Sequence, residues 1–322
     1  MPNIITHGLF AKAVYEEIQN DELKNIIKEY PREFIIGSNG PDFLFFYKLF
    51  QKKYLPVRDL GSLVHAQNTN AFFQMAFELI NQEQDETIKK AMISYVTGHL
   101  CHWALDSHAH PYIFYKTGAY SGISTSFHHR FESMMDAMML KIIRKENIKT
   151  FKFYLLAKQS PYTVEAVSRI YTPIMKEVYG KDLSKKQIKD ALNDWYRIQT
   201  YLYDPTCSKT KLLQTVEKKK NSLWYLSGNV VPVDINPNYD VLNEKKDEWC
   251  YPTDSSKTSH ESFMEIYERA KNDLLDILHH IEDKTYVLNH INNLSYDTGE
   301  SEYKEMIHFD IIYGEKENYE DI

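Results

Sequence analysis

Apolar residues recur at helical spacing over most of the chain. Within residues 5–30 they mark one face of a helix, at Leu9, Phe10, Val14, Ile18, Leu23, Ile26 and Ile27. Steps of three and four residues are the period of an amphipathic helix. The same spacing predicts further helices over residues 63–80, 85–108, 128–145, 162–179, 184–203, 206–226 and 259–283. We therefore expect an all-α protein.

Turn-forming residues separate these segments. The stretch Gly37–Asp42 reads Gly-Ser-Asn-Gly-Pro-Asp and precedes an apolar run, Phe43–Tyr47. Residues 117–126 are rich in Gly, Ser and Thr, and we predict a loop there. We expect an irregular stretch over residues 228–258, which contain Pro232, Pro237 and Pro252.

The composition agrees with one helical domain. The chain has 322 residues, of which 43% are hydrophobic, enough for a sizeable core. With only 11 Gly and 11 Pro it lacks the frequent turns of a many-stranded protein. There is no internal repeat and no clear boundary before the end of the chain. We predict a single multi-helix domain over residues 1–313 and a charged tail over residues 314–322.

The formal net charge of −7 argues against an extended nucleic-acid-binding surface. It does not exclude phosphate chemistry, because bound metal dications would reverse the sign locally. The three cysteines are scattered and give no disulfide framework. Neither a signal peptide nor a membrane-spanning stretch is evident, and we expect a cytoplasmic protein.

The segment Gly98–Tyr112 carries the most concentrated candidate chemistry. It contains four of the thirteen histidines and one aspartate. On a helix His102, Asp106 and His110 advance by four residues each and lie along one stripe. His128 and Glu132 repeat that spacing in the next predicted helix. Imidazole and carboxylate groups arranged in this way suit a borderline cation such as zinc.

Eight residues in the first 132 are candidate metal ligands: His7, Asp42, His65, His102, Asp106, His110, His128 and Glu132. Asp106 has two oxygens and could bridge neighbouring ions. His110, which we expect at a helix end beside Pro111, could turn toward a second ion. Local spacing cannot prove that His7 and His65 arrive at the same place.

The order of these residues resembles a known family. The pattern His-x3-Asp-x3-His-Pro from His102, followed by His-x3-Glu from His128, is accompanied by earlier Thr-His-Gly, Gly-Pro-Asp-Phe-Leu and Leu-Gly-Ser-Leu-Val-His segments. As an ordered set over roughly residues 3–136, it looks like the bacterial zinc-dependent phospholipase C family, which is related in fold to the P1/S1 nucleases.

The resemblance implies a mostly helical domain with a cluster of two or three zinc ions in a cleft. One zinc would be held by His65, His102 and Asp106, with Asp42 beside it. A second would be held by His110, His128 and Glu132. A third would use His7 and Asp106, and in the family also the amino terminus. Asp42 would be the general base or would orient the attacking water.

Three functions remain open at this point. The first is a zinc-dependent phosphodiesterase of the phospholipase C type, with a phosphodiester substrate such as a phospholipid. The second is a P1/S1-like nuclease or nucleotide phosphoesterase. The third is a non-catalytic helical protein stabilised by metal. Structural zinc sites are normally closed and rich in cysteine, whereas a histidine and carboxylate set leaves open positions, so catalysis is favoured.

Four neighbours of the candidate ligands have ordinary alternatives. His99 either hydrogen-bonds a ligand or is a packed helix histidine. His108 and His129 are interpreted as exposed neighbours and not ligands. Asp136 either orients a ligand imidazole or faces solvent.

Overall fold

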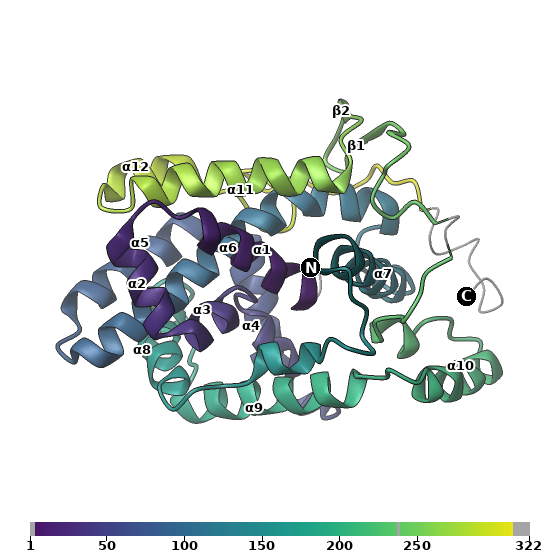
Figure 1. The fold of residues 1–322 in the computed structure, drawn as a ribbon, viewed down its shortest axis with the longest axis horizontal. Coiled ribbons are helices and arrows are strands. Elements are labelled where there is room, and N and C mark those ends of the chain that lie inside the picture. The colour runs from purple at the N-terminus through teal and green to yellow at the C-terminus, as the bar shows by residue number, and fades with distance from the viewer. Residues whose placement is uncertain (1–3, 237–238, 312–322) are drawn as a thin grey trace.

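The computed structural model describes residues 4–236 and 239–311, and within them the protein is built from helices (Figure 1). The α-helices are α1 (Ile4–Glu17), α2 (Asp21–Glu29), α3 (Pro31–Gly37), α4 (Leu55–Ala66), α5 (Thr69–Gln82), α6 (Glu86–Thr117), α7 (Ser124–Arg144), α8 (Thr163–Glu177), α9 (Lys185–Leu202), α10 (Ser208–Lys220), α11 (Phe263–His279) and α12 (Lys284–Ile291). Short 3-10 helices are η1 (Asp42–Phe46), η2 (Lys52–Tyr54), η3 (Phe153–Ala157) and η4 (Ser227–Asn229). The predicted all-α class is confirmed.

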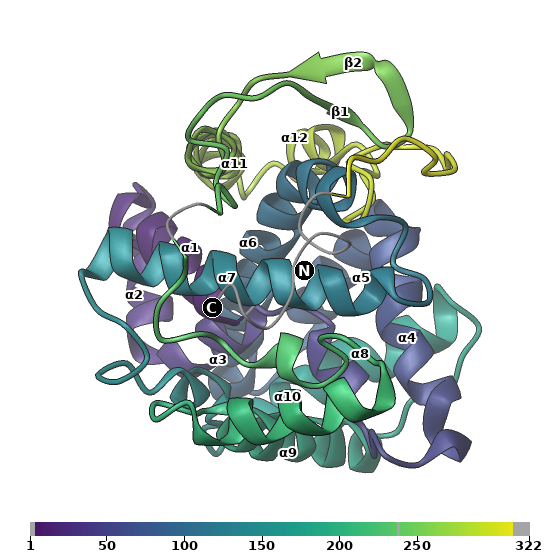
Figure 2. The ribbon, with the colours of Figure 1, turned by 90° about the vertical axis from the view of Figure 1, so that its right-hand side faces the viewer.

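The only sheet among the described residues is a hairpin. Strand β1 (Trp249–Tyr251) pairs antiparallel with β2 (Asp254–Ser259). The hairpin stands at the edge of the molecule near one end of α11 (Figure 1 and Figure 2). The stretch 228–258, predicted to be irregular, therefore contains all of β1 and all but one residue each of η4 and β2. Residues 237–238, and the predicted tail at 314–322, lie outside the described residues.

Helix α6 is the centre of the fold. It is 32 residues long and buried on nearly every side from Ala91 onward. Helices α1, α2, α3, α5, α7, α8 and α11 all pack against it. A helix that is covered on all sides is expected to carry apolar residues on all sides. The buried polar residues of α6 depart from that expectation and therefore need an explanation.

Two predicted helices are each divided in two. The segment 5–30 breaks before Asn20, whose side chain accepts a hydrogen bond from the backbone N–H of Leu23 and starts α2. The segment 63–80 breaks at Asn68, which has a left-handed backbone (φ 62°). Asparagine tolerates that conformation better than most residues, but neither break contains a glycine or a proline.

The prediction that a helix ends near His108 is wrong. Helix α6 continues through Pro111 to Thr117. Pro111 has no N–H to donate to the carbonyl of Ser107, and Gly299 packs directly over that carbonyl. A side chain at Gly299 would bring its Cβ within 2.3 Å of the Ser107 oxygen. Because α6 continues past Pro111, His110 lies within the helix, one turn after Asp106.

Helices α3 and α6 cross at two glycines. A Cβ at Gly37 would lie 2.1 Å from the carbonyl oxygen of Tyr95, and one at Gly98 would lie 2.1 Å from that of Phe34. Such backbone-to-backbone contact needs glycine on both sides. The crossing fixes the turn that follows Gly37 against the middle of α6.

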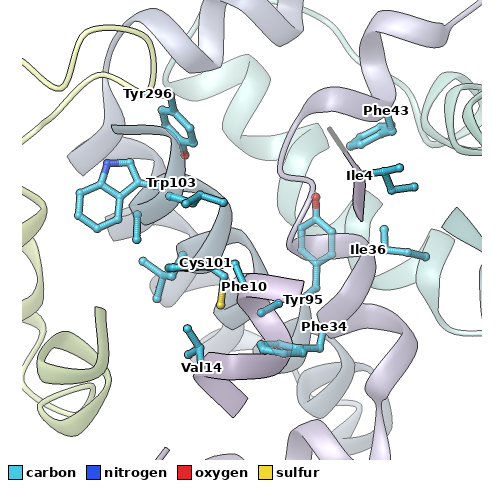
Figure 3. Packing of buried hydrophobic residues seen from close by; sticks show 14 of the residues in the cluster. Ile4, Phe10, Val14, Phe34, Ile36, Phe43, Tyr95, Cys101, Trp103 and Tyr296 are labelled. Atoms are coloured by element: carbon cyan, nitrogen blue, oxygen red, sulfur yellow. The ribbon is translucent and has the colours of Figure 1, made fainter. Parts of the chain in front are cut away.

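One hydrophobic cluster extends from Ile4 to Tyr296 along the chain. Figure 3 shows part of it, with residues of α1, α3 and η1 around the Cys101 and Trp103 region of α6. The cluster contains Met134, Met135 and Met139 of α7 and Phe43 and Tyr47 of the apolar run. These residues fill the core, and the polar centre described next is embedded in it.

Candidate metal centre

All eight predicted ligand residues come together in the interior. They come from five elements: α1, η1, α4, α6 and α7. Each is less than one-tenth exposed. Their ligand atoms form three groups, two of which share His102, and within each group the atoms lie within 4.8 Å of one another.

The first group consists of Asp42, His65 and His102. Asp42 Oδ1 lies 3.4 Å from His65 Nε2 and 3.6 Å from His102 Nε2. The two imidazole Nε2 atoms are 3.3 Å apart. The resemblance placed Asp106 in this group and Asp42 beside it; in the structure Asp42 is a member, while Asp106 Oδ2 lies 3.1 Å from His102 Nε2.

The second group consists of His110, His128 and Glu132. His128 Nε2 lies 2.9 Å from Glu132 Oε1, one turn away on α7. The His110 and His128 rings have their centroids 6.0 Å apart. This is the grouping that the resemblance implies, assembled from two neighbouring helices.

The third group consists of His7, His102 and Asp106. His7 Nε2 lies 3.3 Å from Asp106 Oδ1, and the same oxygen is 3.8 Å from His110 Nε2. Asp106 therefore faces histidines of all three groups, as a bridging carboxylate would. The amino terminus, which the resemblance adds to this site, lies outside the described residues.

Hydrogen bonds on the far side of the rings orient two of the imidazoles. His65 Nδ1 lies 2.8 Å from the carbonyl oxygen of Gly61, and His110 Nδ1 lies 2.7 Å from that of Tyr296. A carbonyl oxygen can only accept, so in each histidine Nδ1 carries the hydrogen. In the neutral imidazole Nε2 then presents its lone pair to the centre, and this is the form that binds metal.

His128 is oriented by a hydroxyl relay. The Thr117 hydroxyl donates to the carbonyl oxygen of Ile113 at 2.8 Å, and His128 Nδ1 lies 3.0 Å from the same hydroxyl oxygen. Because the hydroxyl hydrogen is already used, that oxygen accepts from Nδ1. His128 Nε2 is again left with its lone pair facing Glu132.

Several buried nitrogen and oxygen atoms of the candidate ligands have no hydrogen-bond partner among the described residues. They are His7 Nδ1 and Nε2, Asp42 Oδ1, His102 Nδ1, both oxygens of Asp106, and His110 Nε2. Native proteins rarely bury such groups unsatisfied. The contacts of 3.1–3.8 Å between these side chains lack hydrogen-bond alignment, as expected for lone pairs that converge on a common point. The residues fit a multinuclear metal site.

The pKa values of Asp42 and His65 are coupled. Burial raises the pKa of Asp42 to about 6, although the neighbouring His65 works against that shift. Burial acts to lower the pKa of His65, but the nearby carboxylate of Asp42 outweighs burial and raises the pKa to about 9. The metal-free pair thus holds a proton where a metal ion would supply the positive charge.

Three further histidines of the centre are held neutral. Burial lowers the pKa of His102, His110 and His128. Burial acts to raise the pKa of Glu132, but the neighbouring His128 outweighs it and lowers the pKa to about 2. Neutral imidazoles and an ionised carboxylate are the protonation states that coordinate a dication.

A sequence model of the family described as "Zinc dependent phospholipase C" matches residues 6–181. The chain belongs to the zinc-dependent phospholipase C family. The predicted resemblance is confirmed, and the matched region contains all eight ligand residues. No curated protein and no solved structure matches the chain. Among the described residues, no helix is long and apolar enough to cross a bilayer.

Glycine at position 40 brings the family segment Gly-Pro-Asp-Phe-Leu against α6. Gly40 has a left-handed backbone (φ 47°), and a Cβ there would lie 2.1 Å from Cδ2 of His102. The turn can therefore lie flat on the His102 ring, and Asp42 follows two residues later with its carboxylate in the centre.

Asp136 has a different role from both alternatives considered for it. Its oxygens accept hydrogen bonds from the backbone N–H groups of Ile5 (3.0 Å) and Thr6 (2.8 Å) and from the Thr6 hydroxyl (2.6 Å). These groups are the unpaired donors of the first turn of α1. Asp136 thus ties the start of α1 to α7 and places His7, the next residue.

The three remaining histidines of the motif region lie outside the ligand groups. His99 is buried, stacks on Tyr171 and hydrogen-bonds the Tyr296 hydroxyl, so it is a packed histidine. His108 is half-buried and bonds Asp273 at 2.9 Å. His129 is also half-buried and bonds the Tyr120 hydroxyl. The interpretation of the last two as exposed is wrong.

Two residues at the centre, Tyr296 and Asp297, have no local signature by which the sequence analysis could identify them. Tyr296 contacts ligand histidines from a position 186 residues beyond His110. The Asp297 side chain, 32% exposed, lies 3.9 Å from His110 Nδ1. Neither residue has helical spacing to the other ligands, and both lie beyond the region that the family model matches.

Proposed function

We propose that this protein is a phosphodiesterase of the phospholipase C type that holds two or three zinc ions. The observation that supports it best is the shared carboxylate of Asp106, which faces His7, His102 and His110 at once. Eight residues supply the donors of the three groups, and His102 is common to two of them. A zinc ion with three protein donors keeps one open position in tetrahedral geometry, which is the arrangement of catalytic rather than structural zinc.

In this proposal most of the site residues bind metal. The ions would be held by His7, His65, His102, Asp106, His110, His128 and Glu132, and Asp42 would complete the first group. Bound zinc would supply Lewis acidity, which offsets charge on a phosphate and favours ionisation of water.

Asp42 would accept or direct the proton of the attacking water. Its carboxylate is 9% exposed and lies 3.4 Å from His65 Nε2. A dication bound beside His65 would favour the ionised form of Asp42, which is the state a base requires.

A phospholipid is the substrate that the family suggests, and the cytoplasmic location stays a prediction. The net charge of −7 would not help the protein bind an anionic lipid surface. We therefore expect activity on phospholipids with a zwitterionic head group in preference to anionic ones.

The test is a panel of phosphodiesters assayed with and without a chelator, and again after zinc is restored. Zwitterionic phospholipid vesicles, single-stranded nucleic acid and a nucleotide diester cover the alternatives. Phospholipid hydrolysis that is lost with chelator and restored by zinc supports the proposal. Hydrolysis of nucleic acid alone would replace it with a nuclease, and unfolding by chelator without any turnover would replace it with structural metal.

A pair of variants makes the assay specific. His102→Gln removes a donor that belongs to two groups. His279→Gln changes an exposed histidine of α11 outside the groups. We expect the first to abolish hydrolysis and the second to leave it unchanged.

A further inference from the structure

Residues 295–299, here called the Tyr296 turn, lie beyond the matched region but are bonded to the metal centre. The backbone N–H of Tyr296 donates to the carbonyl oxygen of His65 at 3.0 Å, and the Ser295 hydroxyl donates to the same oxygen at 3.2 Å. The turn is thereby attached to the last turn of α4, at a ligand residue.

The same turn reaches a ligand of another group. The carbonyl oxygen of Tyr296 accepts the hydrogen bond from His110 Nδ1 at 2.7 Å. This bond fixes both the direction of the His110 ring and the position of its hydrogen. One residue of the C-terminal region therefore bonds histidines of α4 and of α6.

The ring of Tyr296 is fully buried among imidazoles. Its centroid lies 5.1 Å from that of His65, 5.7 Å from that of His102 and 6.0 Å from that of His99. Its hydroxyl lies 3.0 Å from His99 Nε2. The ring fills the space behind His65 and His102, so neither imidazole can rotate away from the centre without displacing it.

The turn is anchored independently of the ligands. The residue before it, Leu294, accepts hydrogen bonds through its carbonyl from the Trp103 indole at 3.1 Å and from the Thr69 hydroxyl at 3.0 Å. At its other end Gly299 packs on the carbonyl of Ser107. Helices α5 and α6 therefore fix the turn on both sides, and Figure 3 shows Tyr296 and Trp103 at α6.

We propose that Tyr296 is a positioning residue of the metal centre. Its ring and its backbone hold His65, His102 and His110 with their Nε2 atoms directed at the ions. The inference rests on the proposed zinc chemistry. Partners that orient a ligand histidine are typically worth about 10- to 100-fold in metal affinity, and Tyr296 orients ligands of all three groups.

The experiment measures zinc affinity of the full chain by competition with a chromophoric chelator, at a temperature where circular dichroism shows each variant folded. Tyr296→Ala removes the ring, and we expect zinc affinity to fall by about 10- to 100-fold. Tyr296→Phe keeps the ring and the backbone bonds and loses only the bond to His99, so it should stay within about 3-fold of the natural protein.

Phe263→Ala is the control for general loss of packing. Phe263 is fully buried on α11, and its ring packs against Tyr267, away from the ligands. The Phe263→Ala variant should be less stable than the natural protein but should bind zinc with the same affinity. Equal zinc affinity in Tyr296→Ala and the natural protein would overturn the proposal, and so would an equal loss in Phe263→Ala. Because affinity is read without turnover, zinc binding with no hydrolysis would refute the proposed function alone.

Discussion

At the scale of single residues, the carboxylate of Asp106 organises the centre. It is fully buried on α6, and its two oxygens face different histidines: His7 and His110 on one side, His102 on the other. Burying a charge is costly unless it is paired. His102 and His110, which burial keeps neutral, offer Asp106 no positive charge, and a bound cation would supply it.

Asp106→Asn should remove both charge and bridging ability while keeping side-chain volume. We expect zinc content to fall by at least one ion per chain and kcat/KM for a phosphodiester to fall by at least about 100-fold. Elemental analysis and steady-state kinetics measure the two effects. Asp273→Asn, which changes the exposed partner of His108, is the control, and full zinc content in Asp106→Asn would contradict the bridging role.

Asp42→Asn should separate catalysis from metal binding. If Asp42 handles the proton of the attacking water, turnover should fall by about 10²- to 10⁴-fold, while less zinc is lost than in Asp106→Asn. Kinetics and zinc analysis on the same preparations compare the two variants. An Asp42→Asn protein with full activity would show that the base lies elsewhere.

At the scale of elements, turns and crossings place the ligands. The α3–α6 crossing at Gly37 and Gly98 positions the turn that carries Asp42, and Gly40 lets this turn lie on His102. Asp136 of α7 caps α1 and so places His7. Each contact joins segments that are distant in sequence.

Gly40→Ala should weaken zinc binding as well as lower the free energy of unfolding. An alanine with left-handed backbone costs about 1–2 kcal/mol, and here its Cβ would also press on the His102 ring. Gly180→Ala is the matched control, because Gly180 has φ 63° and nothing within 4 Å of a Cβ. Denaturant unfolding and zinc competition should show similar backbone costs but weaker zinc binding only in Gly40→Ala. Equal zinc affinities would exclude the predicted contact.

The same scale shows what could be predicted from the sequence. His102, Asp106 and His110 share one helix, and His128 and Glu132 share the next, so four-residue spacing was enough to group them. The convergence of His7 and His65 with these stripes depends on how helices pack, and it was inferred from family resemblance. The prediction of a helix end at Pro111 is wrong because tertiary packing around α6 outweighs the local tendency of proline to end a helix.

At the scale of the whole molecule, the metal centre ties together five elements and the C-terminal Tyr296 turn. The hydrophobic periodicity predicted the helical class, since that class depends on local pattern. It could not predict that a short turn at residues 295–299 covers the centre. That contact is a product of the full fold and has no local signature.

Removing the metal should weaken the whole fold. Zinc that binds only the folded chain stabilises it by roughly 4 kcal/mol when free zinc is about 1,000 times Kd. We expect excess chelator to lower the denaturant midpoint accordingly, and added zinc to restore it. Unfolding curves followed by circular dichroism test this, and identical midpoints with and without chelator would contradict it.

The spread of the ligands from His7 to Glu132 over five elements has a consequence for the protein's life in a cell. Ions bound there would cross-link distant parts of the chain, as disulfide bonds do in secreted proteins, and the three free cysteines supply no such link. Zinc capture would then complete maturation. During zinc starvation, we expect newly made chains to stay loosely assembled and to be degraded first.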